Sequence, residues 1–220
     1  MSHKEQPVPP MSDALRAAVR ERSSPVKPLL PPGPRAALLT ATGILVALAF
    51  VAATGVRADA AALGMPIVWV PALVRLAAAG AWMLLIAREA TPSEGVSAPV
   101  RIAAFVSVPA LLLVSAFVVA RAGGNGAGLT PMMCYGKVVA LAIPAMGAAL
   151  WLLRRAFPLR PILAYLGAGL AAGLIAETAL HLTCPSTSPA HMLLIHGGAV
   201  ATAAAFGAVM GAGRLRRGAR

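Results

Sequence analysis

The sequence has few charged residues and few aromatic residues. Only 12% of the 220 residues are charged and 5% are aromatic, whereas 59% are hydrophobic. About 25% of the residues of a soluble domain are normally charged, because its surface must be covered with polar groups. A soluble fold is therefore excluded, and the mean hydropathy of +0.79 indicates an integral membrane protein. The apolar residues are largely small, a mixture that lets helices approach closely in a bilayer.

Six apolar stretches are long enough to cross a membrane. A spanning helix needs about 20 apolar residues, because the hydrocarbon core is roughly 30 Å thick and each residue rises about 1.5 Å. Glycine and proline gather in the breaks between the stretches, where helices must end. The sequence therefore predicts an all-α integral membrane protein with six transmembrane helices near 36–56, 66–87, 100–120, 133–153, 162–182 and 190–212.

These spans divide the chain into three parts. We expect a cytoplasmic tail, a transmembrane domain and a basic cytoplasmic C-terminus, over residues 1–35, 36–213 and 214–220. The first span follows a proline-rich tail and precedes five others, so it is not a cleaved signal peptide. Whether translation begins at Met1 or Met11 stays open.

Lysine and arginine are concentrated on one side of the predicted membrane domain. Fifteen of the 19 lie in the two termini and in the second and fourth breaks. Cytoplasmic segments retain such residues during insertion, so both termini are expected in the cytoplasm. The net charge of +12 then reflects this bias, and we expect no direct contact with nucleic acid.

The chain has only two cysteines, and the predicted topology brings them to one face. Cys134 opens the fourth span and Cys184 closes the fifth. Consecutive antiparallel helices place both thiols at the outer side, where disulfides persist. The alternative, two unrelated small apolar residues, also stays open.

Side chains that bind metals surround Cys184 in the sequence. Glu177, His181 and Cys184 follow at spacings of four and three, which puts them on one helical face. Thiolate and imidazole suit zinc and other soft or borderline divalent metals. The residues that we predict as metal ligands are Cys134, Cys184, His181 and His191.

Glu177 also lies inside a predicted span, where a carboxylate usually has a partner. The candidates are Arg75, Lys137 and His196. A structural ion pair and a direct sensory role both stay open for this residue. His196 is also consistent with a hydrogen-bonded packing residue.

The cytoplasmic tail contains one segment with helical periodicity. Leu15 and Val19 share a face of an amphipathic helix predicted over residues 12–22, with Ser12 as its cap. The prolines between positions 25 and 34 predict a stiff, extended arm. So short a helix needs a partner surface or anionic lipid to persist. In the first case, the residues expected to bind the partner are Leu15, Arg16, Val19, Arg20 and Arg22.

Several short motifs follow in one order along nearly the whole chain. After the tail helix come PVKPLLPP (25–32), a cysteine opening the fourth span, WLLRRAFPLRP (151–161) and HLTCP (181–185), with His196 beyond. In this order they resemble the NrsF family of bacterial membrane anti-sigma factors.

The resemblance implies a non-enzymatic protein that holds an extracytoplasmic-function sigma factor at the inner membrane through its cytoplasmic part. It also implies release of that factor when paired cysteines on the outer side sense heavy metal or oxidative stress. Cys134 and Cys184 occupy the matching positions. No resident cofactor is expected, and a Zn- or Cd-type metal at the cysteines would be transient.

Three other classes fit parts of the sequence. A membrane thiol oxidoreductase that reaches a quinone commonly uses a second thiol pair, but this chain has one pair and no CxxC motif. A small transporter would use Arg75 and Glu177, with helices broken at Pro71, Pro109 and Pro144, yet no inverted repeat is evident. A haem protein would use His181 and His196, but nothing specifies a haem pocket.

Overall fold

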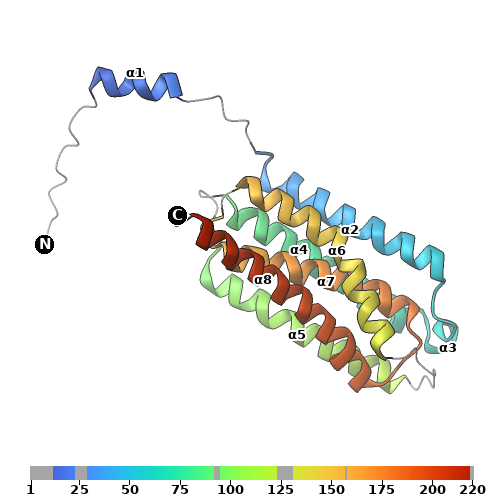
Figure 1. The fold of residues 1–220 in the computed structure, drawn as a ribbon. Coiled ribbons are helices and arrows are strands. Elements are labelled where there is room, and N and C mark those ends of the chain that lie inside the picture. Colours follow the sequence, from blue (N-terminus) through green and yellow to red (C-terminus); the bar gives the residue numbers. More distant parts are fainter. Residues whose placement is uncertain (1–11, 23–28, 92–94, 123–130, 157, 219–220) are drawn as a thin grey trace, which may run out of the picture.

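The computed structural model describes residues 12–22, 29–91, 95–122, 131–156 and 158–218. Met1 and Met11 lie outside these ranges. Within them the regular structure is helical, and no strand is present (Figure 1). The elements are α1 (Asp13–Arg22), α2 (Pro32–Thr54), α3 (Ala60–Leu63), α4 (Met65–Glu89), α5 (Ala98–Arg121), α6 (Pro131–Ala156), α7 (Pro161–Thr183), the π-helix η2 (His191–Gly197) and α8 (Gly198–Gly218).

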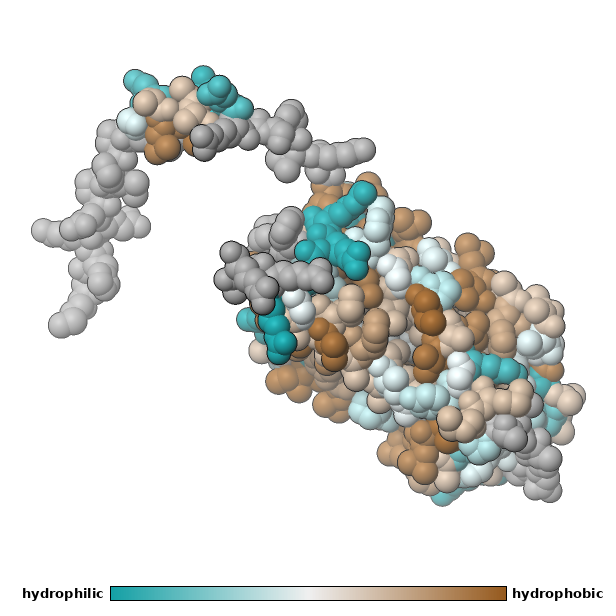
Figure 2. Space-filling model, viewed as in Figure 1, coloured by the Kyte–Doolittle hydropathy of each residue, from teal (hydrophilic) through white to brown (hydrophobic). Residues whose placement is uncertain are grey.

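Six of these helices are long and apolar enough to cross a membrane, with η2 and α8 forming the last span together. Their 23 to 26 residues correspond to about 35–39 Å of helix, which exceeds the roughly 30 Å of a hydrocarbon core. Figure 2 shows hydrophobic and weakly polar residues over the middle of the visible face, with hydrophilic residues toward the ends. The predicted fold class is confirmed.

The two ends of the bundle differ in chemistry. Arg35 in α2 donates a hydrogen bond to the carbonyl of Ala87 in α4 (3.1 Å), and Arg214 in α8 donates to the carbonyl of Arg154 in α6 (3.1 Å). These contacts bring the start of α2 and the ends of α4, α6 and α8 together at what we call the basic end. The opposite end holds both cysteines, and we call it the cysteine end.

The helix α7 lies at the centre, packed against α2, α4, α6 and α8. In its most apolar stretch 78% of residues are buried, against 22% to 44% for the other spans. Its contact with α8 depends on glycine, because a Cβ at Gly169 would collide with the backbone of Ala203, and one at Gly207 with the carbonyl of Tyr165. Small residues permit such close approach in membrane helices. A shift of α7 therefore moves its neighbours.

Three details differ from the sequence-based expectations. The helix α2 begins at Pro32, so the prediction of an extended arm through Pro34 was wrong at its last residues. Proline is tolerated in a first helical turn, whose N–H groups have no partner within the helix. The helices α4, α5 and α6 run unbroken through Pro71, Pro109 and Pro144, which contradicts the broken helices of the transporter interpretation. The short helix α3 was not predicted.

Candidate thiol and metal site

Cys134 and Cys184 meet at the cysteine end. Cys134 lies in the first turn of α6, on a buried face that continues at helical spacing through Val138 and Ala142. Cys184 follows the last residue of α7, where an extended backbone ends the helix. Both are free thiols and both are buried, and their Sγ atoms lie 3.6 Å apart. The structure thus brings together the two residues that the sequence placed at one face.

A π-helical segment brings His191 and His196 to the same side. Residues five apart in an α-helix point about 140° away from each other, because each turn takes 3.6 residues. In η2 the backbone hydrogen bonds reach five residues along the chain, so residues at this spacing lie nearly above one another. The two imidazole rings pack edge to face, with centroids 5.2 Å apart. An α-helical interpretation of the sequence does not predict this pairing.

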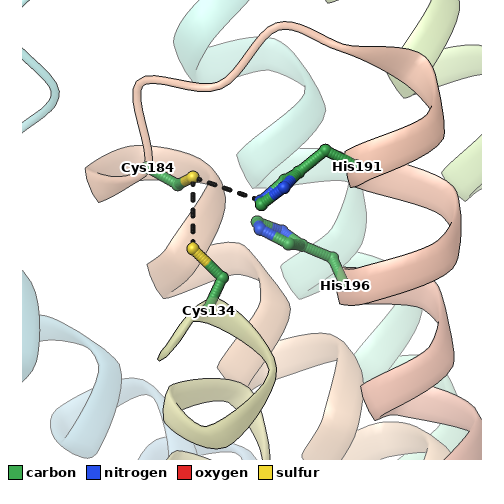
Figure 3. A group of neighbouring side chains, drawn as sticks. All are labelled: Cys134, Cys184, His191 and His196. Carbon is green, nitrogen blue, oxygen red and sulfur yellow. Dashed lines mark hydrogen bonds between the residues drawn. The ribbon is translucent and has the colours of Figure 1, made fainter. Parts of the chain in front are cut away.

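The two thiols and two imidazoles form one compact cluster, shown in Figure 3. Nε2 of His191 lies 3.7 Å from Sγ of Cys184. One nitrogen of each histidine and the sulfur of each cysteine all lie within 4.8 Å of one another. Two cysteines and two histidines are a common ligand set for tetrahedral zinc. The cluster joins α6, the end of α7 and η2.

Behind the cluster lies a buried ion pair. Oε2 of Glu177 in α7 is 2.9 Å from Nε of Arg75 in α4, and both side chains are almost completely buried. The other carboxylate oxygen lies 3.6 Å from Nδ1 of His196. The Arg75 contact is an attraction between charges without the alignment of a hydrogen bond. Of the three partners that the sequence allowed for Glu177, the structure places Arg75 and His196 beside it.

His181 faces away from this cluster. Its Nε2 donates a hydrogen bond to the backbone carbonyl of Val68 in α4 (3.1 Å). Three of the four residues predicted as metal ligands are therefore together, and His196 stands where His181 was expected. The difference arises because His181 lies about 60° around the axis of α7 from Cys184, so that His181 contacts Val68 of α4 while Cys184 lies against His191 of η2.

Arg57 holds the segment that carries Cys184. Its backbone N–H donates to the carbonyl of Leu182 (2.8 Å), and its guanidinium donates to the carbonyl of Pro185 (3.0 Å). The guanidinium also pairs with Asp59, and this hydrogen bond is the main cause that keeps the pKa of Asp59 below its ordinary value. Sequence reasoning treated Arg57 and Asp59 only as a break between spans. The signal in the sequence for this ion pair was the presence of two opposite charges two residues apart.

The tail helix α1 stands apart from the bundle (Figure 1). The hydroxyl of Ser12 accepts a hydrogen bond from the N–H of Leu15, as expected for a cap. Leu15 and Val19 are about half exposed, and Arg16 and Arg20 are also exposed. The side chain of Arg22 lies outside what the structure describes. The helix therefore presents an apolar strip with basic neighbours.

Comparison with protein families shows which family the chain belongs to. The family model described as NrsF, negative regulator of sigma F, matches residues 21–216. The chain belongs to the NrsF family. The resemblance seen in the sequence is confirmed, and the family name implies a negative regulator of a sigma factor. Searches of curated proteins and of solved structures found no match.

Two features of the NrsF match bear on the site. It includes the helices that carry both cysteines and both histidines of the cluster. It begins at Glu21, so most of α1, including Leu15 and Val19, precedes the part of the chain that the NrsF model covers. Anti-sigma regulator families such as NrsF are generally non-enzymatic, and the six apolar helices indicate that this NrsF protein is a multi-pass membrane protein.

Proposed function

We propose that this NrsF protein is an anti-sigma factor of the bacterial inner membrane that sequesters an extracytoplasmic-function sigma factor. It releases that factor when Cys134 and Cys184 react with a heavy metal or an oxidant. The single observation that carries the proposal is the contact of two free, buried thiols, 3.6 Å apart, in a member of a family of negative sigma regulators. The protein acts by binding and release, without catalysis.

The orientation of the bundle supports this assignment. Fifteen of the 19 basic residues belong to the termini and to the breaks at the basic end. Positive residues near span ends stay in the cytoplasm, so the basic end faces the cytoplasm and the cysteine end faces the periplasm. The thiols then lie in a compartment where disulfides persist.

Oxidation of the pair moves two helices. With peroxide, the two thiols lose two protons and two electrons, one S–S bond forms, and the peroxide becomes two waters. A disulfide bond is about 2.05 Å long, so sulfurs now 3.6 Å apart must approach by about 1.5 Å. Because α7 is packed on every side, this movement reaches the basic end.

The tail supplies a surface for the sigma factor. Leu15 and Val19 provide an apolar strip, and Arg16, Arg20 and Arg22 meet acidic groups of the partner. A change from 1% to 99% released requires a stimulus that favours the released state by about 5.5 kcal/mol. Covalent oxidation of the pair or coordination by thiolates supplies free energies of this size.

The test replaces each cysteine by serine, singly and together, and measures sigma-dependent transcription with and without cadmium, chromate or peroxide. Cys134→Ser and Cys184→Ser should each repress normally and fail to respond. Capture of the sigma factor with membranes in the unstressed state checks that repression is direct. Ala199→Ser is the matched control, because it places a hydroxyl at another buried position after η2. A double variant that responds like the unmodified protein would refute the proposal.

A further inference from the structure

We infer that Cys134, Cys184, His191 and His196 form a four-coordinate site for one divalent d10 cation, Zn²⁺ or Cd²⁺, and that Glu177 orients His196 in it. The inference deepens the proposed function and depends on it for its physiological role, since the metal would use the sensing thiols. Binding itself is a property of the isolated chain.

The distances fit a tetrahedral ion. Metal–sulfur bonds of about 2.3 Å and metal–nitrogen bonds of about 2.0 Å give tetrahedral edges of about 3.8 Å between sulfurs and about 3.5 Å between sulfur and nitrogen. The two Sγ atoms are 3.6 Å apart, and Nε2 of His191 is 3.7 Å from Sγ of Cys184. The fourth ligand atom, from His196, lies within 4.8 Å of the others. Closing the site therefore draws the start of α6, the end of α7 and η2 closer together.

His196 is held as a metal-binding histidine is held. Its Nδ1 faces a carboxylate oxygen of Glu177 at 3.6 Å, and the ring is completely buried. Neither ring nitrogen has a hydrogen-bond partner of ordinary geometry among the described residues. When Nδ1 approaches the carboxylate to hydrogen-bond distance, this contact fixes the tautomer and leaves Nε2 for the metal. Glu177 is therefore a positioning residue.

The charges favour a divalent ion. Each thiol releases its proton to solvent when it becomes a thiolate ligand, so two thiolates balance one M²⁺ while both imidazoles stay neutral. The charge of Glu177 is already balanced by Arg75, 2.9 Å away. A monovalent ion would leave one uncompensated negative charge among buried side chains, which is unfavourable. His191 is the least buried of the four and marks the side from which an ion reaches the thiols.

The experiment adds Co²⁺ to the purified, reduced full-length chain in detergent and records visible absorption. We expect one Co²⁺ per chain, the intense bands of a tetrahedral sulfur–nitrogen site, and displacement by Zn²⁺ or Cd²⁺. His191→Ala and His196→Gln should each weaken binding by more than about tenfold. The double variant Arg75→Met, Glu177→Gln removes the carboxylate without leaving a buried charge, and it should weaken binding about 10–100-fold.

The matched control is His181→Gln, because His181 is a buried histidine of α7 that binds the carbonyl of Val68 instead. It should leave Co²⁺ affinity unchanged. Helix content and elution as a single species establish that each variant is folded before its affinity is measured. Octahedral bands, binding of Cu⁺ alone, or loss of binding in His181→Gln but not in His196→Gln would overturn the assignment.

The site and the proposed function fail in different ways. If the chain binds no divalent ion while peroxide still releases the sigma factor, the site is refuted and the function stands. If the tetrahedral site forms but neither cadmium nor peroxide releases a sigma factor, the site stands and the sensing function is refuted.

Discussion

The buried pair of Arg75 and Glu177 permits a sharp test of the bundle's architecture. Both residues are 0% exposed, so solvent does not screen their interaction. Removing one partner of a buried ion pair leaves an uncompensated charge and typically destabilises a protein by about 3–5 kcal/mol. Replacing both partners with uncharged side chains of similar size is often close to neutral.

We therefore predict strong coupling between two substitutions. Arg75→Met and Glu177→Gln should each lower stability by about 3–5 kcal/mol, which for a chain of this length corresponds to a fall in Tm of about 6–20 °C. The double variant should recover most of this loss. Thermal unfolding in detergent, followed by circular dichroism, gives the Tm of the unmodified protein, the two single variants and the double variant, which together form a double-mutant cycle.

A partly buried pair with some access to solvent provides the control for this cycle. Arg101 and Glu89 lie 3.0 Å apart with side chains 19% and 11% exposed. Because solvent screens a partly exposed pair, Arg101→Met should change Tm less than Arg75→Met. Losses that simply add in the double variant, or an Arg75→Met protein as stable as Arg101→Met, would show that the buried pair is not the electrostatic unit described above.

Three further predictions concern the tail, the helix contacts and the orientation. Leu15→Asp and Val19→Asp, made singly, should each weaken capture of the sigma factor, whereas Ala17→Asp, which puts one such charge on the opposite face of α1, should not. Equal capture of the factor by all three variants would exclude the tail as its binding surface. Gly169→Ala should destabilise the bundle by about 1–3 kcal/mol, because the added Cβ would collide with the backbone of α8. Gly147→Ala should change Tm little, because its Cβ would have no atom within 4 Å. Equal effects of the two substitutions would contradict the close α7–α8 contact. Reporters fused to both termini should report cytoplasm, and one inserted between α5 and α6 should report periplasm; a periplasmic C-terminus would invert the proposed orientation.

Much of the fold could be predicted because the relevant physics is local. Each apolar stretch is recognisable from its own composition, so all six spans were found, and their parity placed Cys134 and Cys184 at one face. The need of Glu177 for a partner could also be predicted, because its own apolar stretch shows that it lies inside the membrane. The choice between Arg75, Lys137 and His196 was not accessible, because it depends on how far each helix is rotated about its axis.

The ligand set of the cluster depended on tertiary structure. Spacing along an ideal helix grouped Glu177, His181 and Cys184, but His181 contacts the carbonyl of Val68 in α4, while Cys184 lies against His191 of η2. Five-residue spacing separates His191 from His196 in an α-helix, but the π-helix η2 aligns them. Neither the neighbour that His181 contacts nor the π-helix has a signature in the local sequence pattern.

The amino-acid sequence by itself determined which segments enter the bilayer, since the transfer of each residue from water to lipid is a nearly independent contribution. Only the tertiary structure decided which polar side chains meet inside. Between membrane helices no hydrophobic effect selects a face, so close packing sets their rotation. Here the small residues of α7, including Gly169 against Ala203, set that packing and bring Glu177 toward Arg75 and His196.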